Sequence, residues 1–251
     1  MNKFKLFIIS MLLFGTLNVA AKDYPASLFG VKSDGITLNT RSIQKAIDFI
    51  SENGGGRLIF YVGRYLTGSI RLRSNVTIHL EEGAILVGTP MVYDYFAVNG
   101  IKAMIIADGQ KNIGITGKGV IDGQGAEVAE QVNMQIQKGY LRESVAQASP
   151  ALIAMNNCST ITLNQINLLN ASGNIQSYSG CKNLTIDSLT VKSMTLKGTK
   201  GLILTGCNEV KMSNIYFETV GEEICIDGTS ENVSAVNCKN PDGKILQLKK
   251  R

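Results

Sequence analysis

A repeating pattern of apolar and polar positions runs through the second half of the chain. Apolar residues recur at offsets 0, 2, 5 and 7 after each of three cysteines, as expected for two short strands joined by a small bend. Fainter copies begin at Val76, Ile113 and Val233, so the period is roughly 23 residues. The three clear sets are Ile161, Leu163, Ile166 and Leu168; Leu184, Ile186, Leu189 and Val191; and Val210, Met212, Ile215 and Phe217.

Self-similarity at this period predicts a solenoid, in which each repeat buries its apolar side chains by stacking on its neighbours. A leucine-rich horseshoe needs a Leu-x-x-Leu-x-Leu-x-x-Asn signature and a helix-like return, and neither is visible. Strand repeats separated by turns favour a parallel β-helix instead. We therefore expect one all-β domain, a single-stranded parallel β-helix, over residues 22–251.

Two segments outside the repeat show helical spacing. Asn39 and Thr40 can cap a helix that ends at Asn53–Gly54 and covers the N-terminal end of the stack. The segment Ala126–Glu143 repeats apolar residues every four positions and is expected to be a helical excursion from one coil. The apolar positions are Ile43, Ala46, Ile47 and Ile50 in the first helix and Val128, Val132, Ile136 and Tyr140 in the second.

The first 21 residues read as a secretory signal peptide. Lys3 and Lys5 precede an apolar run from Leu6 to Leu17, and small residues end at Ala21, after which we expect cleavage. No later stretch approaches the roughly 18 apolar residues that a bilayer span requires. The sequence therefore predicts a protein that is secreted or periplasmic and has no membrane association after cleavage.

The five cysteines give an odd count for an exported protein. Cys158, Cys181 and Cys207 recur with the repeat and are expected to stack on neighbouring coils, about 4.8 Å apart. We favour a packing ladder, and a disulfide between two rungs remains the alternative. Because no Cys-x-x-Cys occurs and His79 is the only histidine, we expect no metal site and no cofactor.

The charge of the chain argues against nucleic acid as a partner. The formal net charge is +5, of which Lys3 and Lys5 of the leader supply two. No basic run is interleaved with aromatic residues, which would be typical of nucleic-acid binding. A mildly basic protein is compatible with an acidic polymer as its partner.

Several stretches of the chain together resemble a known family. They are Phe29–Gly35, Asn39–Thr40, Ile43–Ile47, Asn53–Gly56, Gly63–Ser69, Asn75–Ile78, Gly117–Gly123 and Cys181–Ile186. These stretches are similar to the pectin-acting polygalacturonases of glycoside hydrolase family 28. The resemblance implies a right-handed β-helix, a polygalacturonate-like acidic polysaccharide as partner, and inverting cleavage by three carboxylates supported by a Gly-His-Gly and an Arg-x-Lys.

The family's catalytic positions are altered in this chain. Where the family has Asn-Thr-Asp-Gly, the sequence reads Gly198-Thr199-Lys200-Gly201, so a lysine stands in the place of an aspartate. Where the family has its Asp-Asp pair, the sequence has Glu222 and Glu223. The Gly-His-Gly is missing, and His79 is expected to point outward from a strand far earlier in the chain.

An inverting glycosidase needs one protonated carboxylic acid and one carboxylate that activates water. Counting back from the turn position sets Lys200 level with Glu223, whereas matching the apolar residues sets it level with Glu222. In either register a cation about 5 Å away lowers the pKa of the carboxyl group and removes the proton that an acid must donate. The sequence therefore predicts a polygalacturonase-like protein with impaired hydrolysis, and a Lys–Glu contact on a solvated face is the simplest interpretation.

Three alternatives for function stay open. The chain binds polysaccharide through lysines near the last coils, with Lys192, Lys197 and Lys200 as the candidates. Alternatively, it is an active inverting glycosidase that uses Glu222, Glu223 and Asp227. A third possibility is a structural remnant of a longer hydrolase that binds nothing.

The last residues of the chain predict a further strand. Ile245, Leu246 and Leu248 begin it, and three basic residues follow without a capping element. An uncovered coil exposes unpaired backbone groups. We therefore expect that the protein can associate with a partner through this C-terminal coil.

Overall fold

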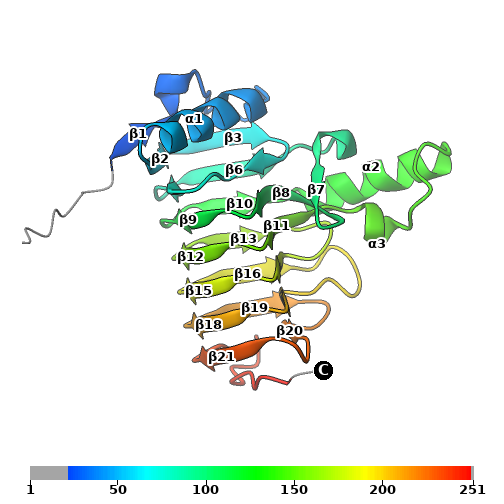
Figure 1. Cartoon of the computed structure of the whole chain (residues 1–251). Coiled ribbons are helices and arrows are strands. Elements are labelled where there is room, and N and C mark those ends of the chain that lie inside the picture. The colour runs from blue at the N-terminus through cyan, green and yellow to red at the C-terminus, as the bar shows by residue number, and fades with distance from the viewer. Residues whose placement is uncertain (1–21, 250–251) are drawn as a thin grey trace, which may run out of the picture.

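The computed structural model describes residues 22–249, which form a right-handed parallel β-helix (Figure 1). Its coils stack three parallel sheets along one axis. The first sheet contains β1 (Asp23–Pro25), β2 (Gly56–Phe60), β5 (Val76–Leu80), β9 (Lys111–Thr116), β12 (Ser159–Asn164), β15 (Lys182–Asp187), β18 (Asn208–Ser213) and β21 (Glu231–Val236). The signal peptide predicted over residues 1–21 lies outside the described residues and stays a prediction.

The second and third sheets complete each coil. The second contains β3 (Gly63–Thr67), β6 (Ala84–Gly88), β10 (Val120–Asp122), β13 (Asn167–Leu169), β16 (Thr190–Ser193) and β19 (Tyr216–Thr219). The third contains β4 (Ile70–Arg71), β8 (Ile101–Asp108), β11 (Ala151–Asn156), β14 (Gln176–Ser179), β17 (Leu202–Thr205) and β20 (Ile224–Ile226), and β7 (Phe96–Val98) pairs antiparallel with β8. Two short 3₁₀ turns, Ala26–Phe29 and Val92–Asp94, lie outside the sheets.

The strand register confirms the predicted repeat. Ile161 pairs with Leu184, Leu184 with Val210, and Val210 with Val233. The bend between the two strands of each coil comes from a residue with positive φ, as at Ser188 and Asn214. Asparagine tolerates this left-handed conformation better than most residues, which explains why it recurs at such positions in the sequence.

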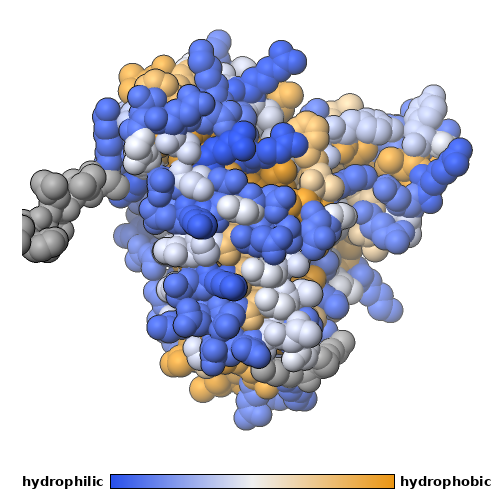
Figure 2. All heavy atoms as spheres, viewed as in Figure 1, coloured by the Kyte–Doolittle hydropathy of each residue, from blue (hydrophilic) through white to orange (hydrophobic). Residues whose placement is uncertain are grey.

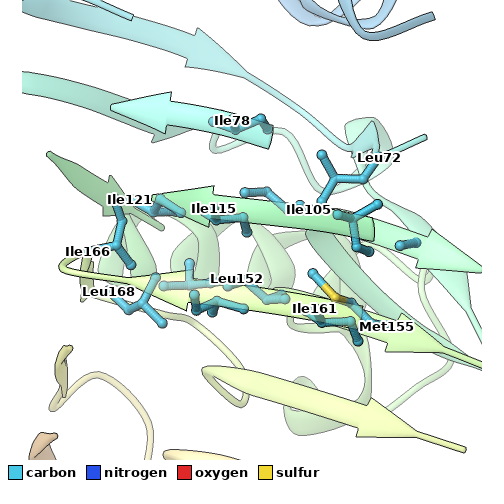
Figure 3. Packing of buried hydrophobic residues seen from close by; sticks show 14 of the residues in the cluster. Leu72, Ile78, Ile105, Ile115, Ile121, Leu152, Met155, Ile161, Ile166 and Leu168 are labelled. Carbon is cyan, nitrogen blue, oxygen red and sulfur yellow. The ribbon is translucent and has the colours of Figure 1, made fainter. Parts of the chain in front are cut away.

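The core lies inside the coils, where the side chains of successive rungs stack (Figure 3). Phe60, Tyr178 and Phe217 are the largest fully buried side chains. Hydrophilic residues cover most of the stacked coils on the face shown in Figure 2, so the apolar half of the repeat points inward. This alternation is the physical basis of the sequence pattern.

The cysteines confirm the packing ladder, and the disulfide alternative is wrong. All five are free and buried. Cys158, Cys181 and Cys207 follow the register of the first sheet, and Ser230 takes the equivalent place one coil later, where its hydroxyl accepts a hydrogen bond from the Cys207 N–H at 3.1 Å. The ladder therefore fills the turn with small, weakly polar side chains.

The N-terminal helix is confirmed, but its predicted cap is wrong in detail. Helix α1 (Thr40–Glu52) covers the N-terminal end of the stack and buries its four apolar residues completely. Asn39 stands at the cap position without a capping hydrogen bond. Its amide instead accepts from the Lys32 N–H at 2.8 Å and donates to the Lys32 carbonyl at 2.9 Å. The Asn39 side chain therefore bonds to the loop before the helix and does not cap the helix.

The predicted excursion is present as two helices. Helix α2 (Gly125–Gln137) and helix α3 (Val145–Ala148) project from the coil beyond β10 (Figure 1). Val128 and Val132 are buried, whereas Tyr140 is 71% exposed. Tyr140 was wrongly expected on the apolar face, because the helix ends before it and Gly139 takes a φ of 74°.

The last described residues fold back across the final coil, which corrects the prediction of another strand without a cap. Lys239 bridges Ile245 in antiparallel orientation, and the Leu246 N–H donates to the Cys238 carbonyl at 2.8 Å. Leu246 and Leu248 pack against the core, so the segment covers part of the coil expected to be open. Within residues 22–249, no helix has the length and apolar character to cross a membrane.

Candidate functional site

The candidate site lies at the C-terminal end of the third sheet, where β17 and β20 are neighbours. A cavity there is lined by Lys200, Ile203, Thr205, Cys225 and Asp227, among others. Lys200 lies two residues before β17, and Asp227 directly follows β20. Continuing the register of the two parallel strands by one residue sets Asp227 beside Thr205, the last residue of β17.

The register settles which glutamate is level with Lys200. Leu202 pairs with Ile224 and Leu204 with Ile226, and the Gly201 N–H donates to the Glu222 carbonyl at 2.9 Å. Continuing this pairing by two residues sets Lys200 level with Glu222, as the matching of apolar residues predicts. Counting from the turn gives a different answer because one extra residue lies between Ile226 and Ser230.

Glu222 accepts a hydrogen bond from inside the site. The thiol of Cys225 donates to Glu222 Oε2 at 2.7 Å, and Cys225 is 9% exposed. Glu222 and Glu223 also line a cavity whose other wall includes Lys244 and Lys249 of the C-terminal segment. Hydrogen-bond donors and cations both favour the ionised form of a carboxyl group. Glu222 therefore lies between the Cys225 thiol and the C-terminal segment.

Asp227 anchors a turn. Its Oδ1 accepts from the Gly206 N–H at 3.1 Å, the Ser230 N–H at 3.1 Å and the Ser230 hydroxyl at 2.7 Å, and its Oδ2 accepts from the Thr229 hydroxyl. These donors, above all the Thr229 hydroxyl, hold the pKa of Asp227 below its usual value. Asp227 is thus an ionised structural group and is a poor choice for a general acid.

The structure separates the three candidate lysines. Lys197 and Lys200 lie on the connection that leads into β17, and Asn174 Oδ1 accepts a hydrogen bond from the Lys200 N–H at 3.1 Å. Lys192 lies on β16 of the second sheet, where its Nζ is 2.9 Å from Glu218 Oε2. The charge of Lys192 is therefore paired, and the roles of all three in binding stay predictions.

Cys225 is a site residue that the sequence reasoning missed. The sequence analysis gives it no role, yet it lines the cavity with Lys200 and lies outside the core cluster that includes Ile226. The alternation of side chains along a strand was the signal that could have placed it outward. His79 lies far from this site on β5, and its Nδ1 is 2.9 Å from Thr116 Oγ1.

No group of three or more His, Cys, Asp and Glu side chains that could hold a metal ion occurs within residues 22–249. Asp227 anchors a turn and lines the cavity that contains Lys200. Glu222 and Glu223 line the cavity beside the C-terminal segment. The expectation of no cofactor stays a prediction. What the described residues offer is a polar surface with a lysine, two glutamates and a fixed aspartate.

Comparison with known sequences and structures gives a consistent result. The sequence model of glycosyl hydrolases family 28 matches residues 61–244. The chain is similar to the crystal structure of a "putative glycosyl hydrolase" from Parabacteroides merdae, with 50% identity and a TM-score of 0.86 over 90% of this chain and 99% of that one. A family 28 exopolygalacturonase from Yersinia enterocolitica matches with a TM-score of 0.73 and 23% identity, over 82% of this chain and 45% of that one.

A curated relative of established name is also similar. An exo-poly-α-D-galacturonosidase from Dickeya chrysanthemi is 27% identical over 236 residues, which cover 83% of this chain and 38% of that protein. The chain spans about two fifths of the length of that relative.

Proposed function

The chain belongs to glycosyl hydrolases family 28, and from this premise we propose that it is an exported, polygalacturonase-like protein that binds an acidic polysaccharide but is impaired in hydrolysis. The substrate class is carried over from the printed names of the relatives. Export rests on the leader sequence, and N-terminal sequencing of the exported protein would give Lys22 as the first residue if cleavage follows Ala21.

The observation that carries the proposal is the register of β17 and β20. It sets Lys200 level with Glu222, one rung away. The sequence resemblance implies that the family presents carboxylates at these two positions. Inverting cleavage needs an acid that keeps its proton until it is transferred to the leaving oxygen. The Cys225 thiol donates to Glu222 Oε2 at 2.7 Å, and a cation one rung away would likewise favour the carboxylate.

Asp227 does not compensate for this loss. Its lowered pKa keeps it ionised, and both its oxygens are engaged in the turn after β20. Asp227 therefore supplies no protonated acid, and an active glycosidase would depend on Glu222 and Glu223 alone. The loss of this candidate acid favours binding over cleavage.

Binding is supported by the charge at the same surface. Lys197 is exposed, and Lys200 lines the cavity beside the third sheet. A polymer of uronic acids carries one carboxylate in each sugar unit, so its attraction to these lysines should weaken as salt screens the charges.

The proposal is tested by equilibrium binding of polygalacturonate at low and high salt, with neutral galactan as the control polymer. We expect binding at low salt that falls as salt rises, weak binding of galactan, and polymer recovered at its original length. Shortened polymer would favour the active glycosidase. Absence of binding at low salt would favour the structural remnant and contradict the proposal.

A further inference from the structure

A separate cavity of about 240 Å³ lies at the other end of the third sheet, where β7 folds back on β8. Its lining includes Arg71, Arg73, Val98, Asn99, Asp108 and Gln110. None of these residues belongs to the candidate site at β17 and β20. The cavity thus brings arginine, aspartate and apolar residues together in a small space.

Of the two arginines that line the cavity, Arg71 is the one positioned to bind an anion. Its guanidinium carbon lies 4.7 Å from the centroid of the Phe96 ring. Its backbone is held by Gln44, whose side chain accepts from the Arg71 N–H at 2.7 Å and donates to the Arg71 carbonyl at 3.0 Å. Within residues 22–249, Arg71 forms no ion pair. Stacking on a ring leaves the edge N–H donors of a guanidinium available for a planar carboxylate.

The wall behind Arg71 is fixed by hydrogen bonds. Gln110 Oε1 accepts from the Ser74 N–H at 2.9 Å, and its Nε2 donates to the Asp108 carbonyl at 2.8 Å. Arg73 Nε donates to Asp48 Oδ1 at 2.7 Å, which orients the second guanidinium group. A cavity with such walls needs little rearrangement to bind a ligand.

The remaining groups suit a sugar that carries a carboxylate. Asp108 Oδ1 accepts from Asn156 Nδ2 at 2.8 Å, and a carboxylate has further acceptor capacity for sugar hydroxyls. Val98 supplies an apolar wall. A phosphate dianion would be repelled by Asp108, whereas a uronic acid places one carboxylate on one side of a ring rich in hydroxyl groups. The chemistry therefore favours a uronate over a phosphate.

A row of polar side chains connects the two cavities. Asp108 pairs with Asn156, Asn156 with Ser179 and Ser179 with Thr205, and the next rung continues to Asp227. Asn99 at the tip of the β7 turn donates to Ser179 Oγ at 3.2 Å. Four steps of about 4.8 Å give a separation of roughly 19 Å, which a polysaccharide of several units can bridge.

We propose that this cavity binds one uronate unit of the polysaccharide, with the sugar carboxylate on the edge of Arg71 and sugar hydroxyls on Asp108. This inference rests on the proposed binding of an acidic polysaccharide. It adds a specific subsite, remote from Lys200, that recognises the charge of a single sugar unit.

Calorimetric titration of the full chain with digalacturonate tests the subsite, with the neutral disaccharide of galactose as the control ligand. We expect digalacturonate to bind and the neutral disaccharide to bind at least about tenfold more weakly, since a charge-assisted pair is lost. Arg71→Gln should weaken digalacturonate binding by about tenfold or more, and Arg71→Lys should weaken it less. Arg64→Gln is the matched control, because Arg64 is an exposed arginine on the second sheet, and it should bind as the unaltered chain does.

Unchanged affinity of the folded Arg71→Gln variant, checked by circular dichroism, would overturn the subsite. So would equal binding of the two disaccharides, or displacement of digalacturonate by an equal concentration of inorganic phosphate. Binding of polygalacturonate is measured in parallel on Lys200→Gln. If polymer binding persists and depends on Lys200 while Arg71→Gln has no effect, only the subsite fails. If no polymer binds, the proposed function fails with it.

Discussion

Two lysine–glutamate rungs lie within the last coils, and they differ in what surrounds them. Lys192 and Glu218 are paired in register on the second sheet, and their charged atoms are 2.9 Å apart on a partly exposed face. Lys200 and Glu222 are level with each other beside the third sheet, where Lys200 lines a cavity and Glu222 accepts the Cys225 thiol. The same two residue types therefore occupy a partly exposed surface in one rung and the candidate site in the other.

Register alone does not define a site. Both rungs follow from the stacking of coils, and an exposed ion pair such as Lys192–Glu218 contributes little to stability. What distinguishes the rung at Glu222 is its enclosure by a thiol and by the C-terminal segment. Changes to the two rungs should therefore have different consequences.

The largest difference is expected when the neutral partner of each glutamate is removed. Cys225→Ala should lower the free energy of unfolding by about 1.5 kcal/mol, because the buried thiol donates a hydrogen bond to a half-buried carboxylate. Tyr216→Phe removes the hydroxyl that donates to Glu218 at 3.3 Å on an exposed face and should cost about 0.5 kcal/mol or less. Denaturant unfolding measures both. Equal losses would remove the distinction between the rungs.

Charge reversal at the two lysines should separate binding from stability. Lys200→Asp is expected to weaken polygalacturonate binding by about tenfold, because it sets a negative charge beside the polymer. Lys192→Asp is the matched control and should leave the affinity within about twofold, because its charge is already offset by Glu218. Titration with the polymer at low salt measures this. A larger loss of affinity for Lys192→Asp than for Lys200→Asp would indicate that the polymer binds on the second sheet.

A smaller effect is expected for the ion pair itself. A double-mutant cycle of Lys192→Ala and Glu218→Ala should give a coupling energy of about 0.2–1 kcal/mol that decreases in high salt. Denaturant unfolding of the four proteins gives the value. A coupling well above this range would mean that the rung on the second sheet is not the solvated contact described here.

The smallest effect concerns the turn beside the Lys200 rung. The pKa of Asp227 is held below its ordinary value of 3.8, chiefly by the Thr229 hydroxyl, so its contribution to stability is complete above that value and is lost as the pH falls through the lower, folded-state value. Asp227→Asn should therefore flatten the loss of stability in acid. Asp242→Asn, at an exposed aspartate, should leave the acid profile unchanged. Thermal unfolding between about pH 5 and pH 2 compares them.

Much of the fold could be predicted from the sequence because stacking repeats the same constraint in every coil. The pairing of Leu202 with Ile224 follows from matching apolar residues, and it also places Lys200 opposite Glu222. The burial of Ile43 and Ile47 follows from their spacing on one helical face. These features depend on local periodicity, which a sequence displays directly.

The remaining features depend on contacts between distant segments. Asn39 was expected to cap a helix, but a loop residue, Lys32, engages its side chain. Lys244 and Lys249 line the cavity of Glu222 because the chain reverses direction after Lys239. The sequence repeat does not predict this reversal. The arginine cavity likewise needs β7 to fold over β8. No periodicity of the sequence encodes these approaches.

We propose that Lys200 beside Glu222 leaves the site without a proton donor for cleavage. The most direct test is the release of new reducing ends from polygalacturonate by the purified chain over a long incubation, compared with Glu222→Gln and a heat-denatured sample. The account predicts that the three give the same background release. Turnover by the unaltered chain that Glu222→Gln abolishes would contradict it.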